Sequence, residues 1–162
     1  MAAGKSTVGP MLARALDWSF LDGDAELVRR SGVSVPEWFQ RRGEAAFRRE
    51  EARVTAELCR QDHVVIAPGG GWAAAEGALD SVPAGTAVIW LRVTVAEAVR
   101  RALADPAVRP LLASDAPLEA ARRLLGAREA AYARADFVID VDGRTPVELT
   151  TEILEWLETN SW

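Results

Sequence analysis

The feature that most constrains this chain is the tetrapeptide Gly4-Lys5-Ser6-Thr7, close to its first residue. Gly-Lys-Ser/Thr is the second half of a phosphate-binding P-loop, in which backbone N–H groups surround phosphate, the lysine reaches the β- and γ-phosphates and the hydroxyl binds Mg²⁺. The apolar residues that follow recur at helical spacing, so the loop leads into a helix N-terminus, which favours an anion. Lys5 is the only lysine among 19 basic residues. A compact ammonium group kept at this one position favours P-loop chemistry over a chance tetrapeptide at a helix start.

The composition is that of an ordinary globular chain. With 162 residues, 49% hydrophobic and 27% charged, we expect one domain spanning residues 1–162. The net charge of −5 disfavours nucleic acid or an anionic membrane as a partner, so an anionic substrate needs local arginine clusters. Cys59 is the single cysteine, which excludes an internal disulfide and a cysteine-based metal site. No signal peptide or transmembrane run is visible, so we expect a cytoplasmic protein. A monomer is the default expectation.

Short β-branched apolar runs alternate with segments of helical periodicity along the chain. The continuous runs at 63–67 and 86–91 are typical of parallel strands buried on both faces. Strands alternating with helices indicate an α/β fold with a parallel sheet. The predicted strands are 18–22, 63–67, 86–91 and 137–140, and the predicted helices are 5–16, 24–30, 36–40, 44–60, 95–103, 118–134 and 146–157.

Polar and glycine-rich groups follow the predicted strands. Asp22 and Asp24 end the first strand, and Gly69 to Gly71 follow the second. Ligands of parallel sheets bind at the carboxyl ends of the strands. These groups and the P-loop residues therefore indicate one site at a single edge of the sheet.

Six motifs, in order and at matching spacing, resemble those of the shikimate kinase family, from Ala3 to about residue 157. The resemblance implies a three-layer P-loop kinase fold, with a parallel β-sheet of five strands flanked by helices. It also implies transfer of the γ-phosphate of ATP to the 3-hydroxyl of shikimate, giving shikimate 3-phosphate for the biosynthesis of aromatic amino acids. The motifs are Gly-Lys-Ser-Thr-Val-Gly at 4–9, Leu-Asp-x-Asp at 21–24, Gly-Glu-x-x-Phe-Arg-x-x-Glu at 43–51, Gly-Gly-Gly at 69–71, Arg-Pro-Leu-Leu at 109–112 and Arg-x-x-x-Tyr at 128–132.

The resemblance places ATP and Mg²⁺ at the P-loop residues. Phosphoryl transfer depends mainly on charge neutralisation and in-line positioning. Lys5 would hold phosphate oxygens, while Ser6 and Asp22 would bind Mg²⁺. Asp22 would also assist deprotonation of the attacking hydroxyl, and an ordinary exposed aspartate at a strand end is the alternative. The expected nucleotide-binding residues are Gly4, Lys5, Ser6, Thr7, Arg101, Arg109, Arg144 and Pro146.

The resemblance also implies a shikimate site. Asp24 would aim the reacting hydroxyl, and it is also a candidate cap for the helix that follows. Arg48 and Arg128 match carboxylate-binding arginines, whose planar guanidinium groups make two parallel hydrogen bonds to a carboxylate; helix pairing with Glu44 and Glu51 is the alternative for Arg48. Three glycines let a ligand approach the backbone. The expected substrate-binding residues are Asp24, Arg48, Gly69, Gly70, Gly71 and Arg128, and the expected catalytic residues are Lys5, Asp22, Asp24 and Arg109.

A proline-bracketed loop, about 105–117, resembles the family's lid. Arg109 in this loop would close over the phosphates and neutralise charge in the transition state. Arg101 would pack near adenine, with Arg144 and Pro146 on its other side.

Two features depart from the family pattern. Trp72 follows the glycines where a small residue is usual, and a bulky indole there would narrow the pocket or stack on the substrate ring. The first glycine of the P-loop, six residues before Lys5, precedes Met1. We therefore expect the native chain to begin upstream with a strand, placed by the resemblance between the strands at 63–67 and 86–91, and we expect the 162-residue chain to have low stability and weak ATP binding. A related small-molecule kinase such as a gluconate kinase, or a catalytically silent nucleotide-binding homologue, is the alternative function.

Overall fold

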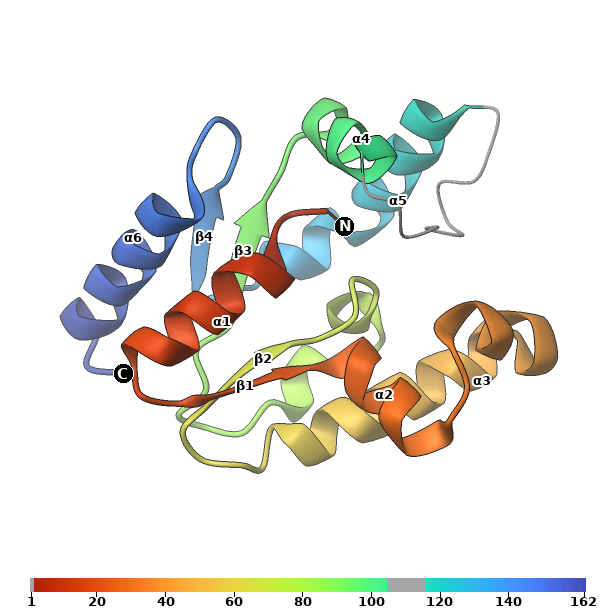
Figure 1. Ribbon diagram of the computed structural model, residues 1–162, viewed down its shortest axis with the longest axis horizontal. Helices are drawn as coiled ribbons and strands as arrows, with labels where there is room; N and C mark the ends of the chain where they lie inside the picture. Colours follow the sequence, from red (N-terminus) through yellow and green to blue (C-terminus); the bar gives the residue numbers. More distant parts are fainter. Residues whose placement is uncertain (1, 105–115) are drawn as a thin grey trace.

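The computed structural model describes residues 2–104 and 116–162 (Figure 1). Strands and helices alternate in these ranges, which confirms the predicted α/β class. The helices are α1 (Lys5–Ala15), α2 (Gly23–Ser31), α3 (Val35–Leu58), α4 (Val95–Ala104), α5 (Pro117–Tyr132) and α6 (Pro146–Thr159), the strands are β1 (Ser19–Asp22), β2 (Val64–Ala67), β3 (Ile89–Arg92) and β4 (Phe137–Asp140), and the short 3₁₀ helices are η1 (Trp72–Ala74) and η2 (Leu79–Ser81).

Local sequence signals explain where several helices begin. Ser34 and Thr145 each accept from the backbone N–H three residues on, where a glutamate completes a capping box, and proline occupies the first turn of both α3 and α6. Helix α3 joins the two helices predicted at 36–40 and 44–60. Gly43 lies between these two parts with φ +77° and ψ 166°, so α3 bends there.

The strands form two parallel pairs. β1 pairs with β2, from Ser19 opposite Val64 to Asp22 opposite Ala67, and β3 pairs with β4. Within the residues that the structure describes, β2 and β3 do not pair with each other, so the sheet is not continuous. Two expectations were wrong in detail. The third strand begins at Ile89 instead of residue 86, and most residues of β2 and β3 are half-buried instead of buried on both faces, because each strand has one open edge.

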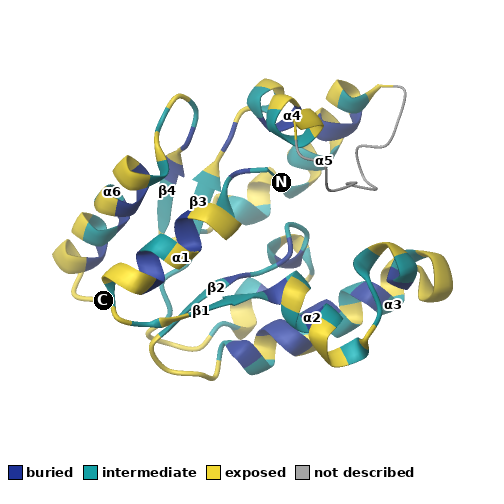
Figure 2. Ribbon diagram, in the orientation of Figure 1, coloured by how far each residue is buried: buried dark blue, intermediate teal, exposed yellow. Residues whose placement is uncertain are grey.

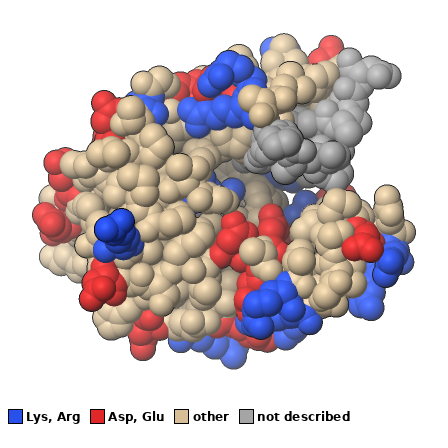
Figure 3. Space-filling model, in the orientation of Figure 1, with Lys and Arg blue, Asp and Glu red and all other residues tan. Residues whose placement is uncertain are grey.

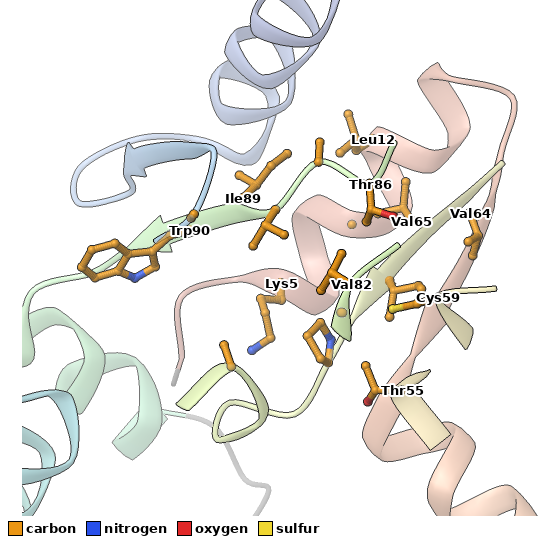
Figure 4. Close-up of a pocket in the computed structure, with 18 of the residues that line it drawn as sticks. Lys5, Leu12, Thr55, Cys59, Val64, Val65, Val82, Thr86, Ile89 and Trp90 are labelled. Carbon is orange, nitrogen blue, oxygen red and sulfur yellow. The ribbon is translucent and has the colours of Figure 1, made fainter. Parts of the chain in front are cut away.

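A cavity of about 420 Å³ lies between these two open edges. Figure 4 shows side chains from α1, β2 and β3 around it, among them Leu12, Val65 and Ile89. The additional strand expected from the sequence would lie between these same two strands, and it remains a prediction. Trp72 also lines the cavity and is only 7% exposed, so its indole belongs to this interior space.

Two clusters of buried side chains position the carboxyl ends of the strands. In the first, α1 packs against α6 and the inner sides of both helices are buried (Figure 2). In the second, Leu27, Trp38 and Phe47 join α2 to α3. Helix α1 also lies very close to β1, because a Cβ on Gly9 would stand 2.3 Å from the ring of Phe20. The start of α1 is thereby fixed beside the end of β1.

We predict that an apolar strand between β2 and β3 stabilises this fold. Extending the chain at its N-terminus by about ten residues, with a Val- and Ile-rich strand leading into Gly-x-x-x-x-Gly-Lys-Ser, would pair both open edges and fill the cavity. Burying roughly two or three apolar side chains, at about 1.5–3 kcal/mol each, raises Tm by roughly 10–30 °C in a domain of this size.

Thermal melts of the two versions, with and without ATP and Mg²⁺, test this prediction. We expect a larger ATP-dependent rise in Tm in the extended form than in the 162-residue chain, which should bind ATP more weakly. The control is an extension of equal length made of Gly and Ser. Equal melting temperatures and equal ATP shifts in the short and extended forms would contradict the prediction.

Candidate active site

The first turn of α1 meets the end of β1. The hydroxyl of Ser6 donates to Oδ2 of Asp22 at 2.9 Å, so the two predicted metal ligands lie in direct contact. Gly4 precedes the helix with φ +93°, a left-handed conformation that favours glycine. Lys5 is the first residue of α1 and lines the cavity beside it (Figure 4). Thr7 lies in the same first turn, where its backbone N–H donates to the carbonyl of Gly4.

Asp22 has a second structural role as the N-cap of α2. Its Oδ1 accepts from the backbone N–H groups of Asp24 and Ala25 at 3.0 and 3.1 Å. The sequence suggested Asp24 as a candidate cap of this helix. The structure shows that the cap is Asp22. Because Asp22 uses one oxygen for the cap and the other for Ser6, its carboxylate is held in one orientation next to the P-loop residues.

The segment Gly69–Gly71 runs very close to side chains of α2 and α3. A Cβ added to Gly69 would lie 2.0 Å from Oε1 of Glu51 and 2.8 Å from Oδ1 of Asp24. A Cβ added to Gly71 would lie 2.5 Å from Nη1 of Arg48. The absence of side chains in this segment lets the backbone lie against Asp24 and Arg48, two predicted substrate-binding residues, and against Glu51.

Arg48 lies between two glutamates of its own helix. Its Nη1 donates to Oε2 of Glu51 at 2.8 Å, and its Nε and Nη2 donate to Oε1 of Glu44 at 3.4 and 3.3 Å. The helix pairing considered as an alternative for Arg48 is therefore present. Burial acts to lower the pKa of Arg48, but the two ion pairs outweigh it and the pKa is raised.

Glu51 is a buried carboxylate with only 4% of its surface exposed. Burial raises the pKa of Glu51, and the Arg48 guanidinium acts in the opposite direction. Its Oε1 has no hydrogen-bond partner among the residues that the structure describes, and it faces Gly69 and Asp24. Glu51 thus holds Arg48 from inside the protein, where replacement by water is hindered.

Helix α5 approaches the same glycine segment from the other side. Nη1 of Arg128 donates to the carbonyl of Gly70 at 3.0 Å, and the hydroxyl of Tyr132 donates to the same carbonyl oxygen. The structure therefore brings Arg48 and Arg128, the two predicted carboxylate-binding residues, to one short segment. Tyr132 was not among the predicted site residues, although its spacing of four residues from Arg128 places both on one face of a helix.

The residues predicted at the adenine end lie around the carboxyl ends of β3 and β4. Arg101 donates from Nε to Glu97 at 2.7 Å and from Nη2 to the carbonyl of Val141 at 3.2 Å. Arg144 pairs with Glu152 at 2.6 Å, and Pro146 is the first residue of α6. Arg109 and most of the predicted lid at 105–117 lie outside the described residues.

Ser6 and Asp22 fit a magnesium ion better than a transition metal. Both side chains offer oxygen ligands. In phosphate-transfer sites Mg²⁺ binds one or two protein oxygens, and phosphates and water supply the remaining ligands. Within 2–104 and 116–162, no three His, Cys, Asp or Glu side chains gather in a way that could hold a metal.

The surface around this site carries both signs of charge. Figure 3 shows a hollow on this face, with acidic and basic side chains along its edge. Among the helices of the described residues, none is long and apolar enough to span a membrane.

We predict that Gly69 does not tolerate a side chain. Gly69→Ala should lower the free energy of unfolding by about 1–3 kcal/mol, because the new methyl group meets two carboxylates inside a packed region. Gly126→Ala is the matched control, since a Cβ there meets nothing within 4 Å and alanine favours a helix by roughly 1 kcal/mol. Urea denaturation of both variants measures the difference, and equal midpoints would contradict it.

Comparison with known proteins agrees with this geometry. The family model for shikimate kinase matches residues 1–158. The shikimate kinase of Synechococcus sp. (strain RCC307) is 41% identical over 157 residues, covering 97% of this chain and 80% of that protein. The shikimate kinase of Moorella thermoacetica is 41% identical over 163 residues, covering 98% and 93%.

Solved structures show the same relationship. The structure of shikimate kinase from Acinetobacter baumannii in complex with shikimate superposes with a TM-score of 0.93 at 33% identity, covering 99% of this chain and 89% of that one. Shikimate kinase from Aquifex aeolicus superposes with a TM-score of 0.83 at 34% identity, covering 99% and 93%. The fold is therefore the predicted P-loop kinase fold, and the chain belongs to the shikimate kinase family.

Proposed function

We propose that this chain transfers the γ-phosphate of ATP to the 3-hydroxyl of shikimate, with Mg²⁺, as a single catalytic domain spanning residues 1–162. One observation carries the proposal: Arg48 and Arg128, on separate helices, both contact the segment Gly69–Gly71 beside Asp24. That arrangement suits a small substrate with one carboxylate and several hydroxyls.

The phosphate end of the site is the first turn of α1. Lys5 and the backbone N–H groups near Gly4 bind the phosphates, where the helix dipole favours negative charge. Ser6 and Asp22 would hold the magnesium ion, which would supply neutralisation of phosphate charge. Their direct contact keeps both oxygens between the first turn of α1 and the end of β1.

The substrate end lies between α3 and α5. The guanidinium groups of Arg48 and Arg128 bind the shikimate carboxylate, and Asp24 accepts a hydrogen bond from the reacting hydroxyl and directs its oxygen toward the phosphate. Arg109, which lies outside the described residues, would close over the phosphates and neutralise charge in the transition state. Arg101, Arg144 and Pro146 lie at the adenine end.

An assay of ADP release tests the reaction. We expect release that depends on shikimate and not on gluconate, because only shikimate offers a carboxylate fixed on a ring. ADP release with gluconate but not with shikimate would indicate a gluconate kinase. ATP binding without ADP release in the presence of either compound would indicate a catalytically silent homologue.

We predict that Arg48→Ala weakens shikimate binding by about 1.5–3 kcal/mol, the usual value for a charged hydrogen bond. ATP affinity should stay nearly constant. Arg49→Ala is the matched control, since Arg49 is the next residue of the same helix and is exposed. Calorimetric titration with each ligand measures both affinities, and an equal loss for ATP and shikimate would identify Arg48 as structural.

We predict that the two aspartates separate by their kinetics. Asp24→Asn keeps the shape and removes the charge, so kcat should fall by roughly 100-fold while the KM for shikimate changes little. Asp22→Asn should instead raise the Mg²⁺ concentration needed for half-maximal rate. Steady-state rates over a series of Mg²⁺ concentrations distinguish the two, and wild-type turnover in Asp24→Asn would exclude its role.

A further inference from the structure

We propose that Tyr132 is a positioning residue of the shikimate site, acting through the Gly70 carbonyl on the guanidinium of Arg128. This inference rests on the proposed function. The proposed reaction gives no role to the tyrosine of the Arg-x-x-x-Tyr motif at 128–132, and this inference supplies that role.

The geometry that supports it is a shared acceptor. Nη1 of Arg128 and the hydroxyl of Tyr132 both donate to the carbonyl oxygen of Gly70. The two donors are four residues apart, one turn along α5, so both side chains leave the helix on the same face. A carbonyl oxygen has two lone pairs and accepts both bonds.

The backbone around Gly70 does little to fix the orientation of this carbonyl group. Gly70 lies between Gly69 and Gly71, and three consecutive glycines restrict the backbone dihedrals weakly. The position of the segment therefore depends on its neighbours, which are the α3 side chains Glu51 and Arg48 on one side and Arg128 and Tyr132 on the other. With Tyr132 in place, the carbonyl has a second fixed donor and does not follow the movements of the longer, more flexible arginine.

The consequence for the ligand lies in the orientation of Arg128. Its bond to Gly70 uses Nη1, and a guanidinium carries five N–H donors in a rigid fork. A carbonyl fixed by Tyr132 sets the rotation of that fork, and this rotation determines which pair of parallel donors faces a carboxylate. Tyr132 therefore acts on binding of the carboxylate and not on the phosphates at the start of α1.

The ring of Tyr132 packs against Trp90, apart from the contact of its hydroxyl, so a substitution can remove the hydroxyl and keep the ring. Its centroid lies 5.6 Å from that of Trp90 at an interplanar angle of 49°. Phenylalanine keeps this ring packing and removes only the hydroxyl. Tyr132→Phe should raise the KM for shikimate roughly 3- to 10-fold, as expected for one hydrogen bond, and leave kcat and the KM for ATP within about 2-fold.

A double-mutant cycle tests whether the hydroxyl acts through Arg128. The quantity measured is kcat/KM for shikimate in wild type, Tyr132→Phe, Arg128→Ala and the double variant. In the Arg128→Ala background, Tyr132→Phe should change kcat/KM by less than about 2-fold, because the fork that it orients is absent. Trp90→Phe is the control for ring packing, and it should change the KM for shikimate less than Tyr132→Phe does.

The outcomes separate the two proposals. A wild-type chain that shows no shikimate-dependent ADP release overturns the proposed function and this inference with it. Wild-type release together with an unchanged KM in Tyr132→Phe overturns the role of Tyr132 alone. An equal effect of Tyr132→Phe with and without Arg128 also overturns it, because the hydroxyl would then act independently of the guanidinium. A loss of ATP and shikimate affinity together would identify Tyr132 as a structural residue only.

Discussion

The close approach of a backbone without side chains to α3 and α5 determines the geometry of this site. Atoms of Glu51, Asp24 and Arg48 lie 2.0, 2.8 and 2.5 Å from positions where ordinary residues would carry a Cβ, closer than van der Waals contact allows. Because the segment Gly69–Gly71 lies that close, charged groups from three helices face one small volume. The carboxyl end of β2 supplies the segment, and the pairing of β2 with β1 brings it beside Asp22 and the start of α1.

Much of the fold could be predicted from the sequence, because the residues that determine where helices and strands begin lie close together along the chain. The starts of α3 and α6, and the apolar run of β4, depend on a few neighbouring residues and were predicted within one or two positions. The contact between Ser6 and Asp22 also followed from topology, since a P-loop helix starts at the carboxyl edge of a parallel sheet. Local chemistry and one topological rule are sufficient for these features.

Other features depend on how elements pack, and the sequence does not show them. The start of β3 was misplaced because residues 86–88 have strand-like composition, whereas strand pairing also needs a neighbour on the correct side. The role of Asp22 as cap of α2 depends on which of two nearby aspartates points back at the helix. The partners of Arg128 and Tyr132 depend on the rotation of α5 about its axis relative to β2, which no motif specifies.

The ion pairs of Arg48 also show how a chain with a net charge of −5 can bind an anion. The bond from Arg48 to Glu51 is short, and the Glu51 carboxylate is buried. The bonds from Arg48 to Glu44 are 3.3 and 3.4 Å long, and the side chain of Glu44 is 59% exposed. An exposed pair of that length contributes little, so a ligand carboxylate can replace Glu44 at small cost, whereas breaking the buried pair would leave Glu51 uncompensated. The two glutamates therefore act differently on one guanidinium. Glu51 fixes its direction, and Glu44 occupies the Nε and Nη2 donors that a bidentate carboxylate needs.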